Sequence, residues 1–280
     1  HSDKLVARLE EEPEAAKIGG DNKDVTIIFT DIKGFTAFSE KHTPQEVVNR
    51  LNEYLGVMVE VIERYDGYVD KFIGDGIMAY WGAPLPQADH AKLAIACVLA
   101  MRESMAELHV KWQAEGVEPF SIRAGVQSGE VVAGNVGLRG KKMEYTVIGD
   151  TVNQAARLES SAKYYEVDTL VGQNAYLRTC DVFGYRELDK IRMVGKQVAV
   201  TVYELIGPKT VEENKLNSLF AAALAVYRTG AWDEAERHFA SIIAEFPHDR
   251  PSAMYLERCQ YFKGTPVTAG WDGVFNRRGK

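Results

Sequence analysis

Two aspartates stand where apolar segments of the sequence end, at positions that could bind a metal ion. Asp31 follows the β-branched apolar run of residues 25–29, and Asp75 stands between Gly74 and Gly76. A carboxylate at the end of a buried strand is unfavourable unless it is paired or ligated. If the two segments lie side by side, the carboxylates suit hard divalent cations, which can clamp the oxygens of an in-line phosphoryl displacement. On these segments alone, a helix-capping Asp31 and an ordinary turn at Asp75 remain alternatives.

A third polar segment runs from an apolar stretch through Gly149 into a helical pattern. Asn153 and Arg157 are four residues apart in it, so they share one face of the expected helix. An amide and a guanidinium on one face suit a ribose and a charged, phosphorane-like transition state. A polar stripe that faces solvent is the alternative for this segment taken alone.

The elements that must position these residues are strands and helices in irregular alternation. Apolar residues with a period of two predict strands, and those with a period of 3.6 predict helices, one of which begins with the capping box Thr43-Pro44-Gln45-Glu46. The mixture favours an α+β fold with a mostly antiparallel sheet and flanking helices. We expect strands at 25–29, 68–72, 77–81, 120–126, 130–136, 143–148, 168–171 and 199–206. Helices are expected from Pro44 to a stop at Asp66-Gly67, and at 88–115 and 151–163.

Together these segments resemble the class III nucleotidyl cyclases, the adenylyl and guanylyl cyclase family. Four motifs occur in order over about residues 20–207: FTDIKGFT, DKFIGDGIMAYWG, the expected strand pair IRAGVQSGEVVAGNVG, and YTVIGDTVNQAARLE. The resemblance implies a ferredoxin-like, palm-type fold and two divalent cations, Mg²⁺ or Mn²⁺. It assigns metal binding to Asp31, Asp75 and the Ile32 carbonyl, transition-state stabilisation to Asn153 and Arg157, and phosphate binding to Gly34, Phe35, Thr36 and Arg123.

The resemblance also implies which purine is chosen. Lys71 matches the purine-selecting Lys of adenylyl cyclases, and Thr146 matches a subgroup that includes bicarbonate-responsive enzymes. A Lys ammonium can donate to adenine N1, whereas guanine N1 carries a hydrogen. The Thr146 hydroxyl can accept from the adenine 6-amino group, but it can also donate. Adenylate cyclase is therefore the prediction, with a guanylate cyclase or a relaxed-purine cyclase as the alternative.

In this family the active site lies between two catalytic domains, and this chain carries each half of the required residues once. The resemblance therefore implies a homodimer with two equivalent sites that convert ATP into 3′,5′-cyclic AMP and pyrophosphate. A catalytically silent nucleotide-binding module is a further alternative. The presence of Asp31, Asp75, Asn153 and Arg157 together argues against it.

Charge and composition divide the chain and exclude some partners. The 33 Lys and Arg residues against 40 Asp and Glu residues give a net charge of −7, which makes nucleic acid an unsuitable partner. Three dispersed cysteines form no disulfide framework, and no apolar run is long enough to span a membrane, so we expect a cytoplasmic catalytic domain. We expect a connector at 1–22, with a sensor or membrane module upstream of it, and a catalytic domain at 23–208.

The last part of the chain, 209–280, lacks strand patterns, and its residues 210–280 carry nine acidic and nine basic residues. Helices are expected at 214–229, 233–246 and 250–262, and the first two resemble one tetratricopeptide-type helix pair. A single such unit cannot bury its apolar face on sister repeats, so it must pack elsewhere. A plain stabilising extension and a partner-binding module both remain open.

Overall fold

The computed structural model describes residues 19–138, 142–192, 198–210, 214–265, 267 and 270–275, so most of the expected connector lies outside the described residues. One eight-stranded sheet dominates it, with the strand order β2-β3-β1-β4-β6-β8-β7 and β5 paired to β4. All neighbouring strands are antiparallel except β4 and β6. The strands are β1 (Gly19–Lys33), β2 (Tyr68–Ile73), β3 (Gly76–Trp81), β4 (Ser121–Leu138), β5 (Lys142–Ile148), β6 (Thr169–Gly172), β7 (Phe183–Arg192) and β8 (Ala199–Pro208).

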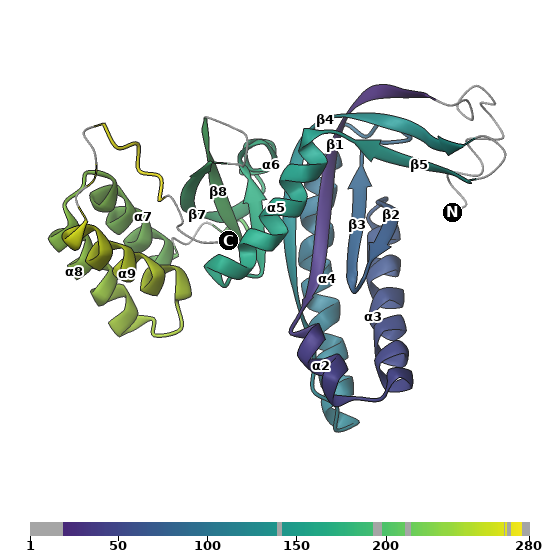
Figure 1. Cartoon of the computed structure of the whole chain (residues 1–280), viewed down its shortest axis with the longest axis horizontal. Coiled ribbons are helices and arrows are strands. Elements are labelled where there is room, and N and C mark those ends of the chain that lie inside the picture. Colours follow the sequence, from purple (N-terminus) through teal and green to yellow (C-terminus); the bar gives the residue numbers. More distant parts are fainter. Residues whose placement is uncertain are drawn as a thin grey trace.

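Helices cover both faces of this sheet (Figure 1). On one face, α3 and α4 pack against strand residues such as Ile28 and Ile32, whereas the other face carries Val25 and Ile27 in a core that includes Ala155 of α5. The expected α+β class is confirmed. The helices are α2 (Phe35–Lys41), α3 (Pro44–Arg64), α4 (His90–Ala114), α5 (Asp150–Tyr165), α6 (Gln173–Leu177), α7 (Lys215–Arg228), α8 (Trp232–Glu245) and α9 (Arg250–Gly264).

Local signals explain several helix boundaries. The Thr43 side chain accepts from the Glu46 backbone N–H, and the Glu46 carboxylate accepts from the Thr43 backbone N–H, so the expected capping box starts α3. Within the described part of the chain, no helix is long and apolar enough to cross a membrane.

One expectation about the strands is wrong. The segment expected as two strands, 120–126 and 130–136, is the single strand β4, which pairs with β1 over fifteen residue positions. Gly129 lies between the two expected strands, and its lack of a side chain serves close packing. A Cβ there would lie 2.8 Å from the Thr151 hydroxyl oxygen on α5, closer than real contacts allow.

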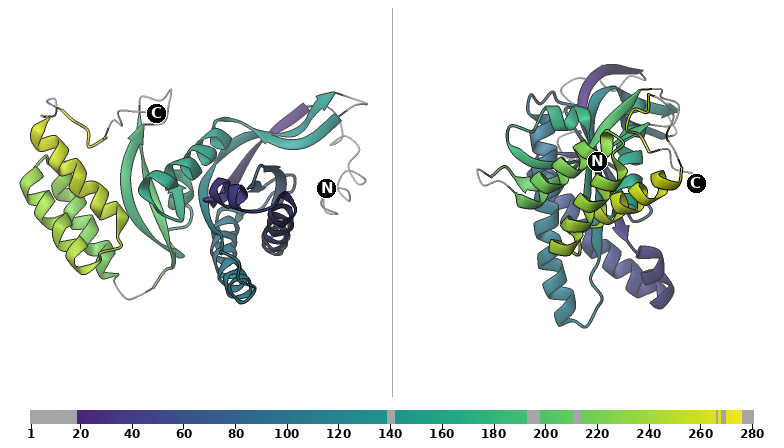
Figure 2. Two further views of the ribbon diagram at one scale, coloured as in Figure 1. Left: turned by 60° about the horizontal axis from the view of Figure 1, so that its bottom comes forward. Right: turned by 90° about the vertical axis from the view of Figure 1, so that its left-hand side faces the viewer.

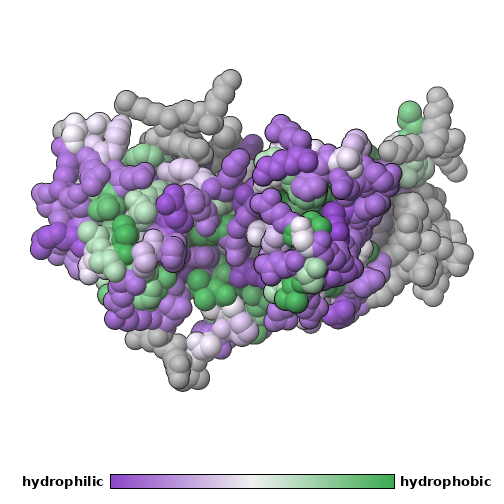
Figure 3. Space-filling model, turned by 90° about the horizontal axis from the view of Figure 1, so that it is seen from below, coloured by the Kyte–Doolittle hydropathy of each residue, from purple (hydrophilic) through white to green (hydrophobic). Residues whose placement is uncertain are grey.

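The three C-terminal helices form a compact unit on the β7 and β8 side of the sheet (Figures 1 and 2). They share one apolar core with α5 and β7, in which Phe220, Phe239 and Tyr255 of the extension join Leu158 and Leu188. Seen from below, hydrophilic residues surround scattered apolar patches over both parts (Figure 3). The extension therefore packs against α5 and β7 of its own chain.

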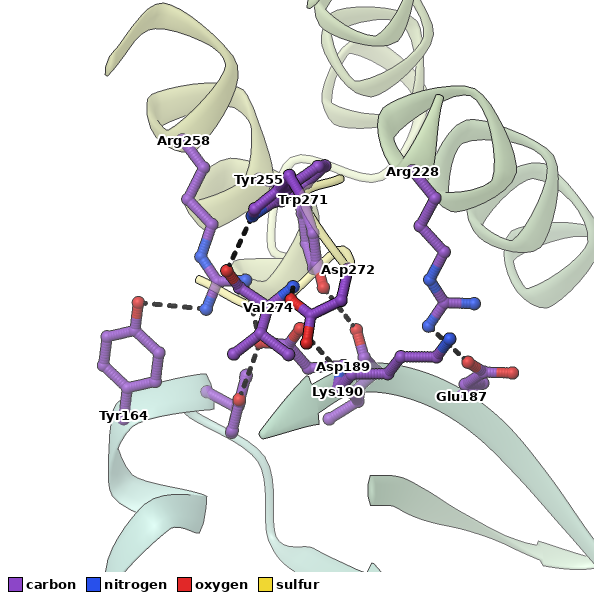
Figure 4. Close-up of polar contacts among 12 residues, drawn as sticks. Tyr164, Glu187, Asp189, Lys190, Arg228, Tyr255, Arg258, Trp271, Asp272 and Val274 are labelled. Carbon is purple, nitrogen blue, oxygen red and sulfur yellow. Dashed lines mark hydrogen bonds and ion pairs between the residues drawn. The ribbon is translucent and has the colours of Figure 1, made fainter. Parts of the chain in front are cut away.

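Polar contacts fix the same interface (Figure 4). The Arg258 guanidinium of α9 lies 2.7 Å from the Asp189 carboxylate of β7, and it donates to the Tyr164 hydroxyl at the end of α5. The Tyr255 hydroxyl donates to the Leu188 carbonyl at 2.7 Å. The final described segment returns over this interface, with Val274 buried.

Candidate functional site

The carboxylates of Asp31 and Asp75 meet at one edge of the sheet. Strand β1 continues past Thr30, where its pairing with β3 ends, and the turn between β2 and β3 supplies Asp75 beside it. The Ile32 backbone N–H donates to the Asp75 carboxylate at 3.2 Å. A side chain on Gly76 would run into the Thr30 carbonyl, so glycine is required for the turn to lie this close to β1. The predicted convergence of the two aspartates is present.

The negative charge of the carboxylates at this edge is partly balanced by one arginine. Burial raises the pKa of Asp75, and the nearby Asp31 charge raises it further. Arg123, opposite Asp31 on β4, donates to the Asp31 carboxylate at 2.8 Å and lies 3.8 Å from Glu159 of α5. Burial also raises the pKa of Glu159, with Asp31 as the next cause. This edge therefore carries more negative charge than the single guanidinium compensates.

The available donor atoms fit a hard divalent cation. Two carboxylates face the edge, and the Ile32 carbonyl points there as well, because the N–H and C=O of one residue in an antiparallel strand point to the same side and this N–H meets Asp75. Oxygen ligands of this kind are those that Mg²⁺ and Mn²⁺ prefer. Across the described ranges, no set of three or more His, Cys, Asp or Glu side chains could hold a metal, so water or substrate oxygens would have to complete the coordination shell of a cation here.

Asn153 and Arg157 lie on α5, which begins after Gly149 and packs on β4. Ala155 and Leu158 face the core, which leaves Asn153 exposed and Arg157 half-buried on another side. Glu159 is the α5 residue that reaches Asp31 and Arg123, and it lies six positions after Asn153, or about 9 Å along the axis at 1.5 Å per residue. Within one chain, Asn153 is therefore set apart from the carboxylate pair.

Lys71 and Thr146 come together from two different strands. Lys71 Nζ on β2 lies 3.2 Å from the Asp70 carboxylate and 3.9 Å from that of Glu144 on β5. Thr146 is buried on β5, and burial raises the pKa of the nearby Asp70 against the lowering effects of Thr146 and Lys71. The structure thus assembles the two expected purine-selecting residues around an acidic residue.

The expected phosphate-binding residues fall into two places. Gly34 caps α2 in the left-handed conformation with φ of 75°, which favours glycine, and Phe35 and Thr36 form the first turn of that short helix. Arg123 lies instead between Asp31 and Glu159, where it neutralises the Asp31 carboxylate.

Two residues of this region were missed from the sequence. Glu159 ends the last motif, and Asp70 begins the second. The sequence signal for Asp70 was an acidic residue inside a strand segment directly before Lys71. For Glu159 the sequence signal was a glycine, Gly125, inside an expected strand. The structure shows that this glycine permits close approach of helix and strand, because a Cβ there would overlap the backbone of Glu159 on α5.

Comparisons with known proteins agree with this arrangement. Residues 20–207 match the family described as "Adenylate and Guanylate cyclase catalytic domain", and the chain belongs to this family. It is 36% identical over 185 residues to Adenylate cyclase 1 of Rhizobium meliloti, an alignment that covers 66% of this chain and 28% of that protein. The chain thus matches less than a third of that relative's length.

Two solved structures share the fold of the catalytic part. The adenylyl cyclase CyaB from P. aeruginosa is 32% identical with a TM-score of 0.63, and the match covers 69% of this chain and 98% of that one. The guanylyl cyclase Cya2 is also 32% identical, with a TM-score of 0.64, and the match covers 70% of this chain and 98% of that one.

Proposed function

We propose that this protein is an adenylate cyclase that converts ATP into 3′,5′-cyclic AMP and pyrophosphate. The observation that carries the proposal is the convergence of Asp31 and Asp75 at the sheet edge, in a chain that also presents Asn153 and Arg157 on one helix face. Asp31, Asp75 and the Ile32 carbonyl would hold two divalent cations, which when bound would activate the ribose 3′-hydroxyl and neutralise the triphosphate.

The side chains of the protein supply the remaining steps. The Asn153 amide orients the ribose, and the Arg157 guanidinium stabilises the charge that develops on the α-phosphate as pyrophosphate leaves. Gly34, Phe35 and Thr36 offer backbone N–H groups to the phosphates at the start of α2. Arg123 pairs with Asp31, and with cations at the two aspartates its guanidinium would be available to a phosphate oxygen instead.

The purine choice follows from Lys71 and Thr146. Lys71 donates to adenine N1, which is an acceptor, and Thr146 accepts from the 6-amino group, which is a donor. The adenylate cyclase relatives support this choice. The likeness to the guanylyl cyclase Cya2 favours GTP as the second candidate substrate. Incubation with ATP or GTP and Mg²⁺ or Mn²⁺, with detection of the cyclic product, distinguishes them, and no product from either nucleotide would refute the proposal.

We also propose that two chains share each active site. The position of Asn153 along α5, apart from the carboxylate pair, supports a site that takes its metal ligands from one chain and its transition-state residues from the other. Phe72, Ile73 and Ile148 are each about half exposed on β2 and β5, which supports an interface there.

Complementation between inactive variants tests the shared site. A mixture of Asp31→Ala and Asn153→Ala chains should regain about a quarter of the wild-type rate, because half of the randomly paired dimers contain one intact site of two. The matched control mixes Asp31→Ala with Asp75→Ala, which damage the same half of the site and should recover nothing. Equal rates from the two mixtures would rule out sharing.

For the C-terminal extension we propose a brace for α5, built on a tetratricopeptide-like α7–α8 pair. Leu158 and Tyr165 of α5 lie in the core that the extension completes. This placement supports a stabilising role for residues 209–280, which follow a catalytic domain at 23–208. The first strand of that domain, β1, begins slightly before the expected boundary, at Gly19.

A further inference from the structure

Gln127 is a buried amide on β4 that lies under α5 and takes no part in the proposed chemistry. Alternate residues of a strand share a face, and at Gly125 and Gly129 this face of β4 meets α5, because a Cβ on either glycine would run into the helix. Gln127 stands between the two glycines, so its side chain is the one that this stretch of β4 offers to the helix. The residue is only 4% exposed.

A chain of hydrogen bonds joins this amide to the start of α5. The Ser128 backbone N–H donates to Gln127 Oε1 at 3.1 Å, and Gln127 Nε2 donates to Gln154 Oε1 at 2.7 Å. Gln154 Nε2 in turn donates to the Asp150 carboxylate, also at 2.7 Å. A backbone N–H can only donate and a carboxylate can only accept, so the two ends of the chain fix the direction of the bond between the amides.

The neighbouring strand leaves room for the Gln127 amide. Strand β6 runs beside β4 with Val171 opposite Val126, which places Gly172 next to Gln127. A Cβ on Gly172 would lie 2.5 Å from Gln127 Oε1, closer than real contacts allow. A larger residue in β6 would therefore displace the amide from its position under the helix.

We propose that Gln127 is a positioning residue that holds Asn153 in place for the transition state. Gln154 directly follows Asn153, so the bond between the two amides fixes the rotation of α5 and its position along β4 beside the ribose-orienting side chain. The apolar contacts of Ala155 and Leu158 also hold the helix, but apolar contacts are non-directional, whereas a hydrogen bond depends on distance and angle. The inference rests on the proposed function of this site, and Gln127 acts there through Asn153 without touching the substrate.

The substitution Gln127→Leu keeps much of the side-chain volume and removes both hydrogen bonds of the amide. The Thr151 hydroxyl still donates to the Glu130 carbonyl at 2.9 Å, so α5 should remain on the sheet with its first turns less precisely placed. We expect kcat to fall about tenfold with the KM for ATP nearly unchanged, because the misplaced group acts mainly in the transition state.

The matched control is Ser128→Ala, the next residue of the same strand. Ser128 is buried as well, and its hydroxyl lies 2.6 Å from that of Thr26, on the strand face turned away from α5. The variant keeps the backbone N–H that Gln127 accepts, so kcat should stay at the wild-type value. Equal kcat values for Gln127→Leu and Ser128→Ala would overturn the proposal.

Gln154→Leu breaks the same bond from the helix side and does not depend on the folding of a variant in the sheet. Gln154 is half-buried, and leucine favours helices. We expect a similar loss of kcat, and the double variant with Gln127→Leu should lose no more than either single variant, because both act through one bond. Losses that multiply would contradict the proposal.

Mixed dimers show which half of a shared site the amide serves. In the mixture of Asp31→Ala and Asn153→Ala chains, the intact site takes Asn153 from the Asp31→Ala chain. Gln127→Leu in that chain should lower the recovered rate about tenfold, whereas in the Asn153→Ala chain it should change the rate less than twofold. Equal losses from the two placements would indicate general loosening and overturn the positioning role.

These results separate the inference from the proposed function. A wild-type chain that forms no cyclic product would refute the cyclase activity, and with it a role for Gln127 in that reaction. An active wild-type chain with an unchanged kcat in Gln127→Leu would refute the inference alone. If the parent mixture recovers no activity, the shared site is refuted, and the kcat of Gln127→Leu against that of Ser128→Ala still decides the role of Gln127.

Discussion

The ion pair between Arg258 and Asp189 offers a direct test of how the extension is held. Its two side chains are 4% and 3% exposed, and their charged atoms lie 2.7 Å apart (Figure 4). Asp189 also accepts from the Tyr165 hydroxyl and from the Lys190 backbone N–H, both at 2.8 Å. The guanidinium further lies over the Tyr255 ring, 4.7 Å from its centroid. Arg258→Met keeps much of the apolar volume and removes the charge.

The expected loss of unfolding free energy follows from the unpaired carboxylate that Arg258→Met leaves behind. Without Arg258 the Asp189 carboxylate stays buried with two neutral donors and no opposite charge, and such a broken buried pair costs about 3–5 kcal/mol of the free energy of unfolding. Adding Asp189→Asn removes the unpaired charge and keeps an acceptor for Tyr165. The double variant should therefore be more stable than Arg258→Met alone. Two independent destabilising substitutions would instead add, and the double variant would then be less stable.

Urea unfolding followed by circular dichroism measures these differences. The matched control is Arg250→Met, also on α9, whose partner Glu166 lies just beyond α5 at the same distance of 2.7 Å. That pair is 58% and 53% exposed, so solvent screens it and its loss should leave the unfolding midpoint almost unchanged. Equal midpoints for Arg258→Met and Arg250→Met would refute the reasoning that burial decides the energy of this contact.

Three further perturbations test the site and the scaffold. Because burial and Asp31 raise the pKa of Asp75, protons should compete with the metal at a pH above the ordinary aspartate range. The acid limb of the rate profile should then move to lower pH as Mg²⁺ is raised, and a limb indifferent to Mg²⁺ would contradict this. Gly76→Ala should push the turn away from Thr30. The cyclase rate in initial-rate assays should then fall at least tenfold, because a catalytic group would be misplaced. Gly56→Ala, in an open position on α3, should raise the unfolding free energy by about 0.5–1 kcal/mol in urea titrations.

Local patterns were enough to predict the elements that carry the site. The turn at Gly74-Asp75-Gly76 combines glycines with two short apolar runs, which is a hairpin signal that needs no distant information. The helix caps and the three C-terminal helices were predicted for the same reason, and each lies within a few residues of its expected range. The convergence of Asp31 with Asp75 followed from the assumption that β1 and β3 are neighbours, which their pairing confirms.

Features that depend on distant contacts could not be predicted this way. Apolar and polar residues alternate poorly along β7, because the buried Arg186 and Asp189 lie in it and form ion pairs with residues far along the chain. Gly129 reads as a break in any local window, and only the position of α5 reveals why a strand continues through it. Glu159 and Asp70 are polar residues whose significance comes from which charge the fold places beside them.

One helix connects the chemistry to the extension. The first half of α5 packs through Ala155 into the core that contains Tyr68, Tyr80 and Val147. Its second half packs through Leu158 into the core that the C-terminal helices complete. A rigid helix transmits a shift at either end, so removal of residues 209–280 should displace Asn153 and Arg157 more than the carboxylate edge, which rests on β1 and β3. Truncation should consequently lower kcat while leaving the choice between ATP and GTP unchanged, because Lys71 and Thr146 lie on β2 and β5, which contribute no residue to the core shared with the extension.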